Sequence, residues 1–74
     1  MTGRKAERKA GGFTYWVTQT ARLMGNGEWE YATLAGLAHR DGGSASGSYG
    51  TTRDRSEADA VWATARREYG IDAA

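Results

Sequence analysis

The segment from residue 13 to 39 constrains the fold most, because two alternating runs are joined by Gly25-Asn26-Gly27. Gly and Asn tolerate the positive φ angles that tight hairpin turns require. A three-residue loop sets Leu23 opposite Trp29 and keeps the apolar side chains of both strands on one face. A two-residue loop would slip the register by one position and mix the two faces. The pattern therefore predicts a β-hairpin with Gly27 in the left-handed conformation.

The flanking strands are predicted over about residues 13–23 and 28–38, where β-branched and aromatic residues are frequent. On their outward face the same register pairs Arg22 with Glu30 and sets Trp16 against Gly36. A Gly/Ser loop is expected over residues 41–47. The brief run of residues 48–52 predicts a short third strand.

The last element is predicted to be an amphipathic helix. Its apolar residues recur at helical spacing and form one stripe: Ala58, Val61, Trp62, Ala65 and Tyr69. Ser56 is a suitable N-cap and Asp54 is a competing one, while Gly70 before Ile71 predicts a left-handed C-terminal cap. Only the inward face of the sheet can bury this stripe. Residues 13–74 therefore predict a single α+β domain: a three-stranded antiparallel meander packed on one face by a single C-terminal helix, βββα.

Residues 1–12 carry four Lys or Arg residues without apolar periodicity, which predicts a flexible basic arm that ends at Gly11-Gly12. The segment lacks the apolar core of a signal peptide, and no stretch of the chain is apolar enough for a membrane span. The sequence has no Cys, which excludes a disulfide and a thiolate metal site. This composition suits a reducing compartment, so we expect a cytoplasmic protein.

The residues that could carry catalysis are few. His39 is the only histidine, and with Asp41 it could form a base and its orienting partner. No Cys nucleophile accompanies this pair, and no second His completes a metal site. The nearby serines occur in a Gly/Ser stretch, where turn chemistry explains them. We therefore expect neither an enzyme nor a bound metal or cofactor.

Binding is the remaining class of function. The net charge is +1, so attraction to a polyanion has to come from local clusters. The candidate nucleic-acid contacts lie on the arm, the outward sheet face and the helix start: Arg4, Lys5, Arg8, Lys9, Trp16, Arg22, Arg53 and Arg55.

The alternative is a protein partner, bound as by an adaptor or inhibitor. It would use an edge strand or the apolar part of the outward face: Trp16, Thr18, Thr20, Ala32 and Leu34. The oligomeric state is open at this level.

The order strand, strand, strand, helix, with the helix opened by RDRSEADAVW over residues 53–62, resembles the arm-type DNA-binding domains of tyrosine recombinases. The likeness covers residues 13–70 in topology and Ser56–Trp62 in motif: a Ser, an acidic residue, Ala and an aromatic. It implies that the sheet face enters the major groove of duplex DNA. We therefore expect a small, non-enzymatic module that binds nucleic acid, duplex DNA first.

Overall fold

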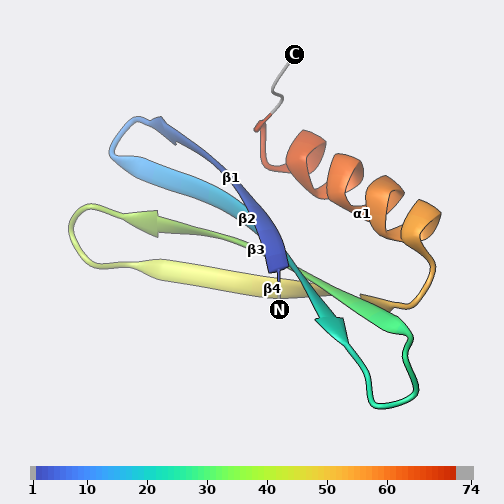
Figure 1. The fold of residues 1–74 in the computed structure, drawn as a ribbon. Coiled ribbons are helices and arrows are strands. Elements are labelled where there is room, and N and C mark those ends of the chain that lie inside the picture. Colours follow the sequence, from blue (N-terminus) through green and yellow to red (C-terminus); the bar gives the residue numbers. More distant parts are fainter. Residues whose placement is uncertain (1, 72–74) are drawn as a thin grey trace.

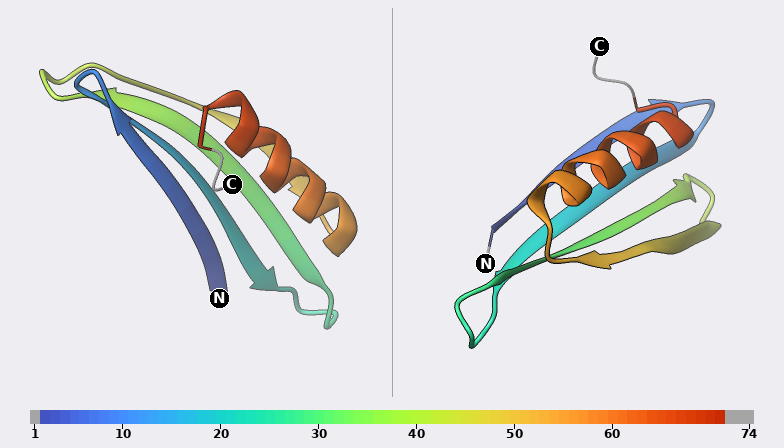
Figure 2. Two further views of the ribbon diagram at one scale, coloured as in Figure 1. Left: turned by 90° about the horizontal axis from the view of Figure 1, so that it is seen from above. Right: turned by 90° about the vertical axis from the view of Figure 1, so that its right-hand side faces the viewer.

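A computed structural model, which describes residues 2–71, contains four strands followed by one helix (Figure 1). The strands are β1 (Thr2–Ala10), β2 (Phe13–Leu23), β3 (Trp29–His39) and β4 (Ser44–Thr52), and the helix is α1 (Arg55–Glu68). The strands form one antiparallel meander in the order β1-β2-β3-β4. Helix α1 lies across one face of this sheet and leaves the other face uncovered (Figure 2).

The predicted three-stranded sheet was wrong, because the segment expected to be a basic arm supplies a fourth strand. Gly11 and Gly12 have φ angles of 59° and 83°. Two successive positive φ angles are typical of the type I′ turn that closes a two-residue hairpin. The Gly pair therefore reverses the chain and sets Ala10 opposite Phe13, instead of ending a tail.

Arginine side chains take the place of apolar residues on the helix-facing side of β1. The guanidinium of Arg4 lies 4.7 Å from the centre of the Trp62 ring, and that of Arg8 lies 5.3 Å from the Tyr15 ring. Between them, the half-buried Ala6 packs against the core. Arginine stems and guanidinium planes cover aromatic surface while their charge stays near water. An Arg-Ala-Arg alternation therefore packs as a strand, although it has no apolar period.

The central hairpin has the predicted register. Leu23 pairs with Trp29, Arg22 with Glu30, and Trp16 with Gly36. The loop is closed by hydrogen bonds from the amide of Met24 to the carbonyl of Glu28 and from the amide of Gly27 to the carbonyl of Met24. Gly27 has a φ of +86°, which confirms the left-handed position.

Strand β4 begins four residues earlier than expected, at Ser44, so the expected Gly/Ser loop shrinks to a tight turn. Its first half has no large apolar side chain that could mark a strand, but its backbone pairs with the exposed edge of β3. One extra residue, Tyr49, interrupts the pairing between Thr33 and Leu34. This bulge directs Tyr49 toward α1, where its ring contacts Tyr69 at 6.5 Å between centres.

The helix begins after Asp54, whose carboxylate accepts hydrogen bonds from the amides of Ser56 and Glu57. Asp54, the competing candidate, is therefore the N-cap, and the predicted N-cap at Ser56 was wrong. At the other end Gly70 has a φ of +68°, and the amide of Ile71 donates to the carbonyl of Arg66. This is the predicted left-handed cap.

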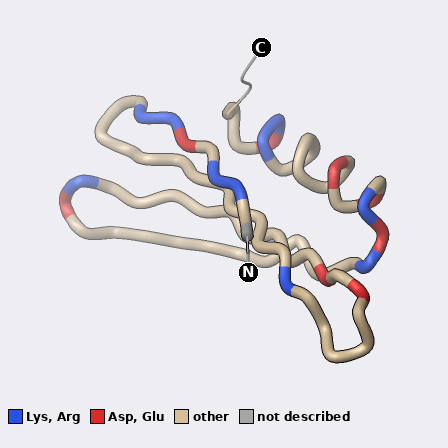
Figure 3. Tube along the Cα trace, viewed as in Figure 1, with Lys and Arg blue, Asp and Glu red and all other residues tan. Residues whose placement is uncertain are grey.

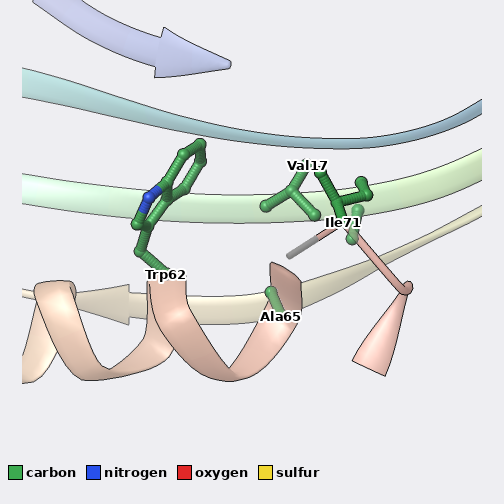
Figure 4. Close-up of a cluster of buried hydrophobic side chains, with 5 residues drawn as sticks. Val17, Trp62, Ala65 and Ile71 are labelled. Carbon is green, nitrogen blue, oxygen red and sulfur yellow. The ribbon is translucent and has the colours of Figure 1, made fainter. Parts of the chain in front are cut away.

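The core is small and lies between α1 and the two central strands (Figure 4). Val17, Ala35 and Ala65 are completely buried, and Trp62 and Ile71 close the cluster. The predicted stripe of α1 is the buried one, since Ala58, Trp62 and Ala65 are its buried residues. Burial of one large ring over small side chains makes Trp62 the main apolar contribution of the helix.

A buried polar network joins the helix to three strands. Gln19, which interrupts the apolar face of β2, is 4% exposed. Its amide nitrogen donates to the hydroxyl of Thr33 (2.9 Å) and to the carbonyl of Ala58 (2.8 Å). Its amide oxygen accepts two hydrogen bonds from Arg4 (3.0 and 2.8 Å). Every polar atom of this amide is thereby satisfied, which allows its burial.

Candidate nucleic-acid interface

The uncovered face of the sheet, here called the outer face, is rich in hydroxyl groups. Strand residues alternate between faces, and the buried Val17 and Ala35 mark the side that faces the helix. The alternate positions of β2 and β4 therefore bring Ser and Thr side chains to the outer face: Thr14, Thr18, Thr20, Ser44, Ser46, Ser48 and Thr51. Hydroxyls of this kind donate to phosphate oxygens in protein–DNA interfaces.

Trp16 lies near the middle of the outer face. A side chain at Gly36 would meet its ring, since an added Cβ would lie 2.6 Å from Cζ2 of Trp16. Gly36 is thus the residue that lets the indole lie over β3. The register sets Glu7 on one side of Trp16 and Gly36 on the other, and the ring is half-buried, so part of its surface stays open to solvent. An aromatic surface displayed in this way can stack on a base or cover an apolar group of a partner.

Two lysines of β1 border the same face. The ammonium of Lys5 lies 3.6 Å from the carboxylate of Glu7. Lys9 forms no ion pair with any carboxylate of residues 2–71. Both positions follow from the β1–β2 register, which pairs Lys5 with Thr18 and Lys9 with Thr14.

The β1–β2 and β3–β4 turns meet at one end of the sheet, here called the tip end. The amide of Arg40 donates to the carbonyl of Gly12 (2.9 Å), which joins the two turns. An open hollow of about 410 Å³ lies at these turns, and its lining includes Lys9, Arg40 and the backbone of Gly11 and Gly12. Neither Arg8 nor Arg40 is paired with a carboxylate of the described chain. The tip end therefore gathers three such cations: Arg8, Lys9 and Arg40.

The opposite end, here called the paired end, holds the remaining predicted arginines (Figure 3). Each of them has a carboxylate partner: Arg4 with Asp59 at 2.7 Å, Arg22 with Glu30 at 2.9 Å, Arg53 with Glu28 at 3.4 Å and Arg55 with Asp59 at 3.7 Å. The molecule is 44 Å along its longest axis. The structure therefore separates Arg53 and Arg55 from Lys9 along the sheet, where the sequence had grouped them as one interface.

A second hollow, of about 420 Å³, opens where α1 begins at the paired end. It is lined by two guanidinium groups, a buried amide and aromatic rings: Gly3, Arg4, Gln19, Ala21, Trp29, Tyr31 and Arg55. Asp59 bridges the two arginines, and Gln19 already accepts from Arg4. One carboxylate thus offsets one of the two positive charges and contacts both guanidinium groups, so an anion in this hollow would have to compete with Asp59.

The residues of the alternative protein-binding surface do lie together. The register places Thr18 beside Leu34 and Thr20 beside Ala32, next to Trp16 on the outer face. Leu34 is 45% exposed. Polar hydroxyls flank this leucine on β2 and β4, so the apolar area that it shares with Trp16 is small.

His39 takes part in the tip end in a structural way. Its ring packs edge-on against Phe13 with 4.6 Å between centres, and its Nδ1 accepts a hydrogen bond from the amide of Asp41. In residues 2–71 no group of three or more His, Asp and Glu side chains is assembled that could hold a metal ion. The one helix in that range is too short and too polar to cross a membrane.

Arg40 is the residue of the candidate surface that sequence reasoning missed. It stands in a turn beside His39 and Asp41, and its nearest cations, Arg8 and Lys9, are far from it along the chain. They come together only because the β1–β2 turn meets the β3–β4 turn, where the amide of Arg40 donates to the carbonyl of Gly12. The Gly pair between two runs was the available signal, because it is a common type I′ turn sequence.

No protein-family model matches this sequence, and no curated protein or solved structure is significantly similar to it.

Proposed function

We propose that the chain is a nucleic-acid-binding module whose contact surface is the outer face together with the tip end. The observation that carries the proposal is the placement of Trp16 on an uncovered, hydroxyl-rich sheet face that ends in a cluster of cations without carboxylate partners. Phosphates would contact Lys9, Arg40 and the Ser and Thr hydroxyls, while Lys5 is paired with Glu7. Trp16 would contact a sugar or a base.

The distribution of ion pairs favours this surface over the helix start. Binding a phosphate at Arg53 or Arg55 first requires separation from Glu28 or Asp59, and those carboxylates then repel the ligand. At the tip end no described carboxylate has to be displaced from Arg8, Lys9 or Arg40. The proposal therefore keeps the nucleic-acid class expected from sequence and moves its centre to the tip end.

The first test is titration of the purified protein into fluorescently labelled mixed-sequence duplex DNA at low salt, followed by fluorescence anisotropy. Single strands of the same sequence form a second arm of the experiment. We expect binding to the duplex, and Trp16→Ala should weaken it by about 5- to 100-fold, as expected for an aromatic that contacts nucleic acid.

Trp29→Ala provides the matched control, because Trp29 is also an exposed tryptophan (40%) but lies on the helix-facing side at the paired end. It should leave affinity unchanged. Equal losses in both variants, or no binding of either nucleic acid at low salt, would contradict the proposal. Binding to a protein partner that is lost on substitution of Trp16 or Leu34 but not of Lys9 would support the alternative function.

A further inference from the structure

The two edges of the sheet differ in their protection against pairing with another strand. β1 carries two lysines, two arginines and a glutamate along one edge. β4, on the other edge, has neither a charged residue nor a proline from Ser44 to Thr52. Residues 44–48 are all exposed. Natural proteins usually protect an edge with Lys, Pro or a bulge, and β4 has only the bulge at Tyr49.

The backbone of β4 directs hydrogen-bonding groups away from the sheet at every second residue. The amide of His39 donates to the carbonyl of Gly43, which fixes the phase of the β3–β4 ladder. Alternation then places Ala45 and Gly47 in the hydrogen-bonded pairs with β3. The amides and carbonyls of Ser44, Ser46 and Ser48 consequently point outward, with no strand beside them among residues 2–71.

The sequence of this edge is its own antiparallel complement. Residues 44–48 read Ser-Ala-Ser-Gly-Ser. If a second copy pairs antiparallel about Ser46, then Ser44 faces Ser48 of the other copy and Ala45 faces Gly47. All facing side chains are small and uncharged, so two backbones can approach without a clash or like-charge repulsion. Pairing of β1 with itself in this way would bring Arg4 of one copy against Arg8 of the other.

We infer that the chain forms a two-fold symmetric dimer in which β4 pairs with β4 of a second copy about Ser46. The three outward-facing residues, Ser44, Ser46 and Ser48, each exchange two hydrogen bonds with their partner, about six in all. The two sheets join into one continuous sheet of eight strands, in which the two outer faces lie on the same side. A symmetric contact of this kind closes on itself, whereas β1 pairing with β4 would build an open fibre. The inference needs no nucleic acid and stands apart from the proposed function.

The test is the molar mass in solution, measured by sedimentation equilibrium across a range of concentrations. The 8.0 kDa chain should approach twice that mass as concentration rises. Ser46→Pro removes a backbone N–H that points away from β3, so no hydrogen bond between β3 and β4 is lost and the fold should persist. The same N–H is needed for pairing between two copies, so the dissociation constant of the dimer should rise about tenfold or more.

Glu7→Pro is the matched control on the other edge. Ala10 and Phe13 close the two-residue turn, so alternation directs the amide of Glu7 away from β2. This variant should dimerise like the wild type. Circular dichroism of both proline variants verifies that the sheet is retained.

A mixing experiment tests the position of the two-fold axis. Ser46→Lys and Ser46→Glu each place like charges opposite one another and should each be monomeric alone, while an equimolar mixture should form a heterodimer. A wild-type chain that stays monomeric to about 1 mM would overturn the inference, because it would mean an affinity of roughly 4 kcal/mol or less. Equal weakening by Ser46→Pro and Glu7→Pro, or no recovery on mixing, would also overturn it.

Discussion

The two ends of the sheet both carry clustered cations, but they use them differently. At the paired end every one of Arg4, Arg22, Arg53 and Arg55 lies against a carboxylate. At the tip end Arg8, Lys9 and Arg40 have no carboxylate partner within residues 2–71. Positive charge at the first end is held in ion pairs, whereas at the second end Arg8 packs on the Tyr15 ring and Lys9 and Arg40 have no ion-pair partner in the described chain.

The difference shows why clusters of charge in a sequence are an incomplete guide to a binding surface. Arg53 and Arg55 stand close together in the chain, but Arg53 is paired with Glu28, and Arg55 shares Asp59 with Arg4. Lys9 and Arg40 are far apart in the chain and are joined by the meeting of two hairpin turns. Pairing across the fold, and not spacing along the chain, decides which cations a polyanion encounters first.

The largest effect should come from the loss of the Trp62 ring in the core. Trp62 lies between Arg4 at 4.7 Å and Arg66 at 5.8 Å and is the largest side chain in the core cluster. We expect Trp62→Ala to reduce the free energy of unfolding by about 3–5 kcal/mol, which unfolds a domain of this size. Thermal unfolding followed by circular dichroism measures the loss. A cooperative transition near that of the wild type would show that α1 does not depend on this ring.

Breaking the buried network at the paired end should have the next largest effect. Gln19→Leu leaves the hydroxyl of Thr33, the carbonyl of Ala58 and the guanidinium of Arg4 without their partner. We expect a loss of about 1–3 kcal/mol in urea unfolding. The double variant Gln19→Leu with Thr33→Val removes one of those unsatisfied groups and should recover part of the loss; a double variant that is less stable than Gln19→Leu would contradict the network.

Arg4→Ala and Lys9→Ala compare the two ends directly. Arg4 contacts Gln19, Asp59 and the Trp62 ring, so its loss should lower the free energy of unfolding by about 1 kcal/mol. Lys9 has no such partner, and its loss should stay within about 0.5 kcal/mol. Both substitutions remove one positive charge from β1. Equal destabilisation in urea unfolding would remove the distinction between structural and available cations.

A smaller effect is expected at Tyr49, which contacts the C-terminal end of α1. Its hydroxyl donates to the carboxylate of Glu68 (2.5 Å), and this hydrogen bond raises the pKa of Tyr49 to about 12 from 10.0. Because the folded state favours the protonated phenol, the stabilisation is complete below pH 10 and is lost as the pH rises toward 12.

Ultraviolet absorbance should show a tyrosine that ionises well above pH 10.0, and Glu68→Gln should move its pKa back toward 10.0. An unchanged titration in that variant would rule out Glu68 as the cause. Glu68 accepts a hydrogen bond from this phenol and forms no ion pair with Arg66 or Arg67.

The sequence predicted the elements that carry a clear apolar period, even where Gln19 interrupts it in β2. The register of the central hairpin, the positive φ of Gly27, the buried stripe of α1 and the cap at Gly70 all followed from side-chain pattern and turn chemistry. These features are local, since each depends on residues that are close in the chain.

Both edge strands were harder to predict because neither buries an apolar row. In β1 the helix-facing positions are Arg4 and Arg8, which pack through cation–π contacts, and in β4 they are Ala45 and Gly47. Their pairing depends on a neighbouring strand that already exists. For the same reason the candidate surface was only partly predicted. Trp16, Lys5 and Lys9 were identified from the sequence, whereas Arg40 joins Lys9 only because β1 pairs with β2 and its turn meets the β3–β4 turn.

The most direct test compares the salt dependence of duplex DNA binding in two double variants. Lys9→Gln with Arg40→Gln changes the tip end, and Arg53→Gln with Arg55→Gln changes the paired end, so each lowers the net charge by two. We expect the first pair to make the slope of log affinity against log salt shallower by about 1.8, from two lost phosphate contacts, and the second pair to leave it unchanged. A slope that falls equally in both variants, or only in the Arg53 and Arg55 pair, would contradict the division of the molecule into a paired end and a binding end.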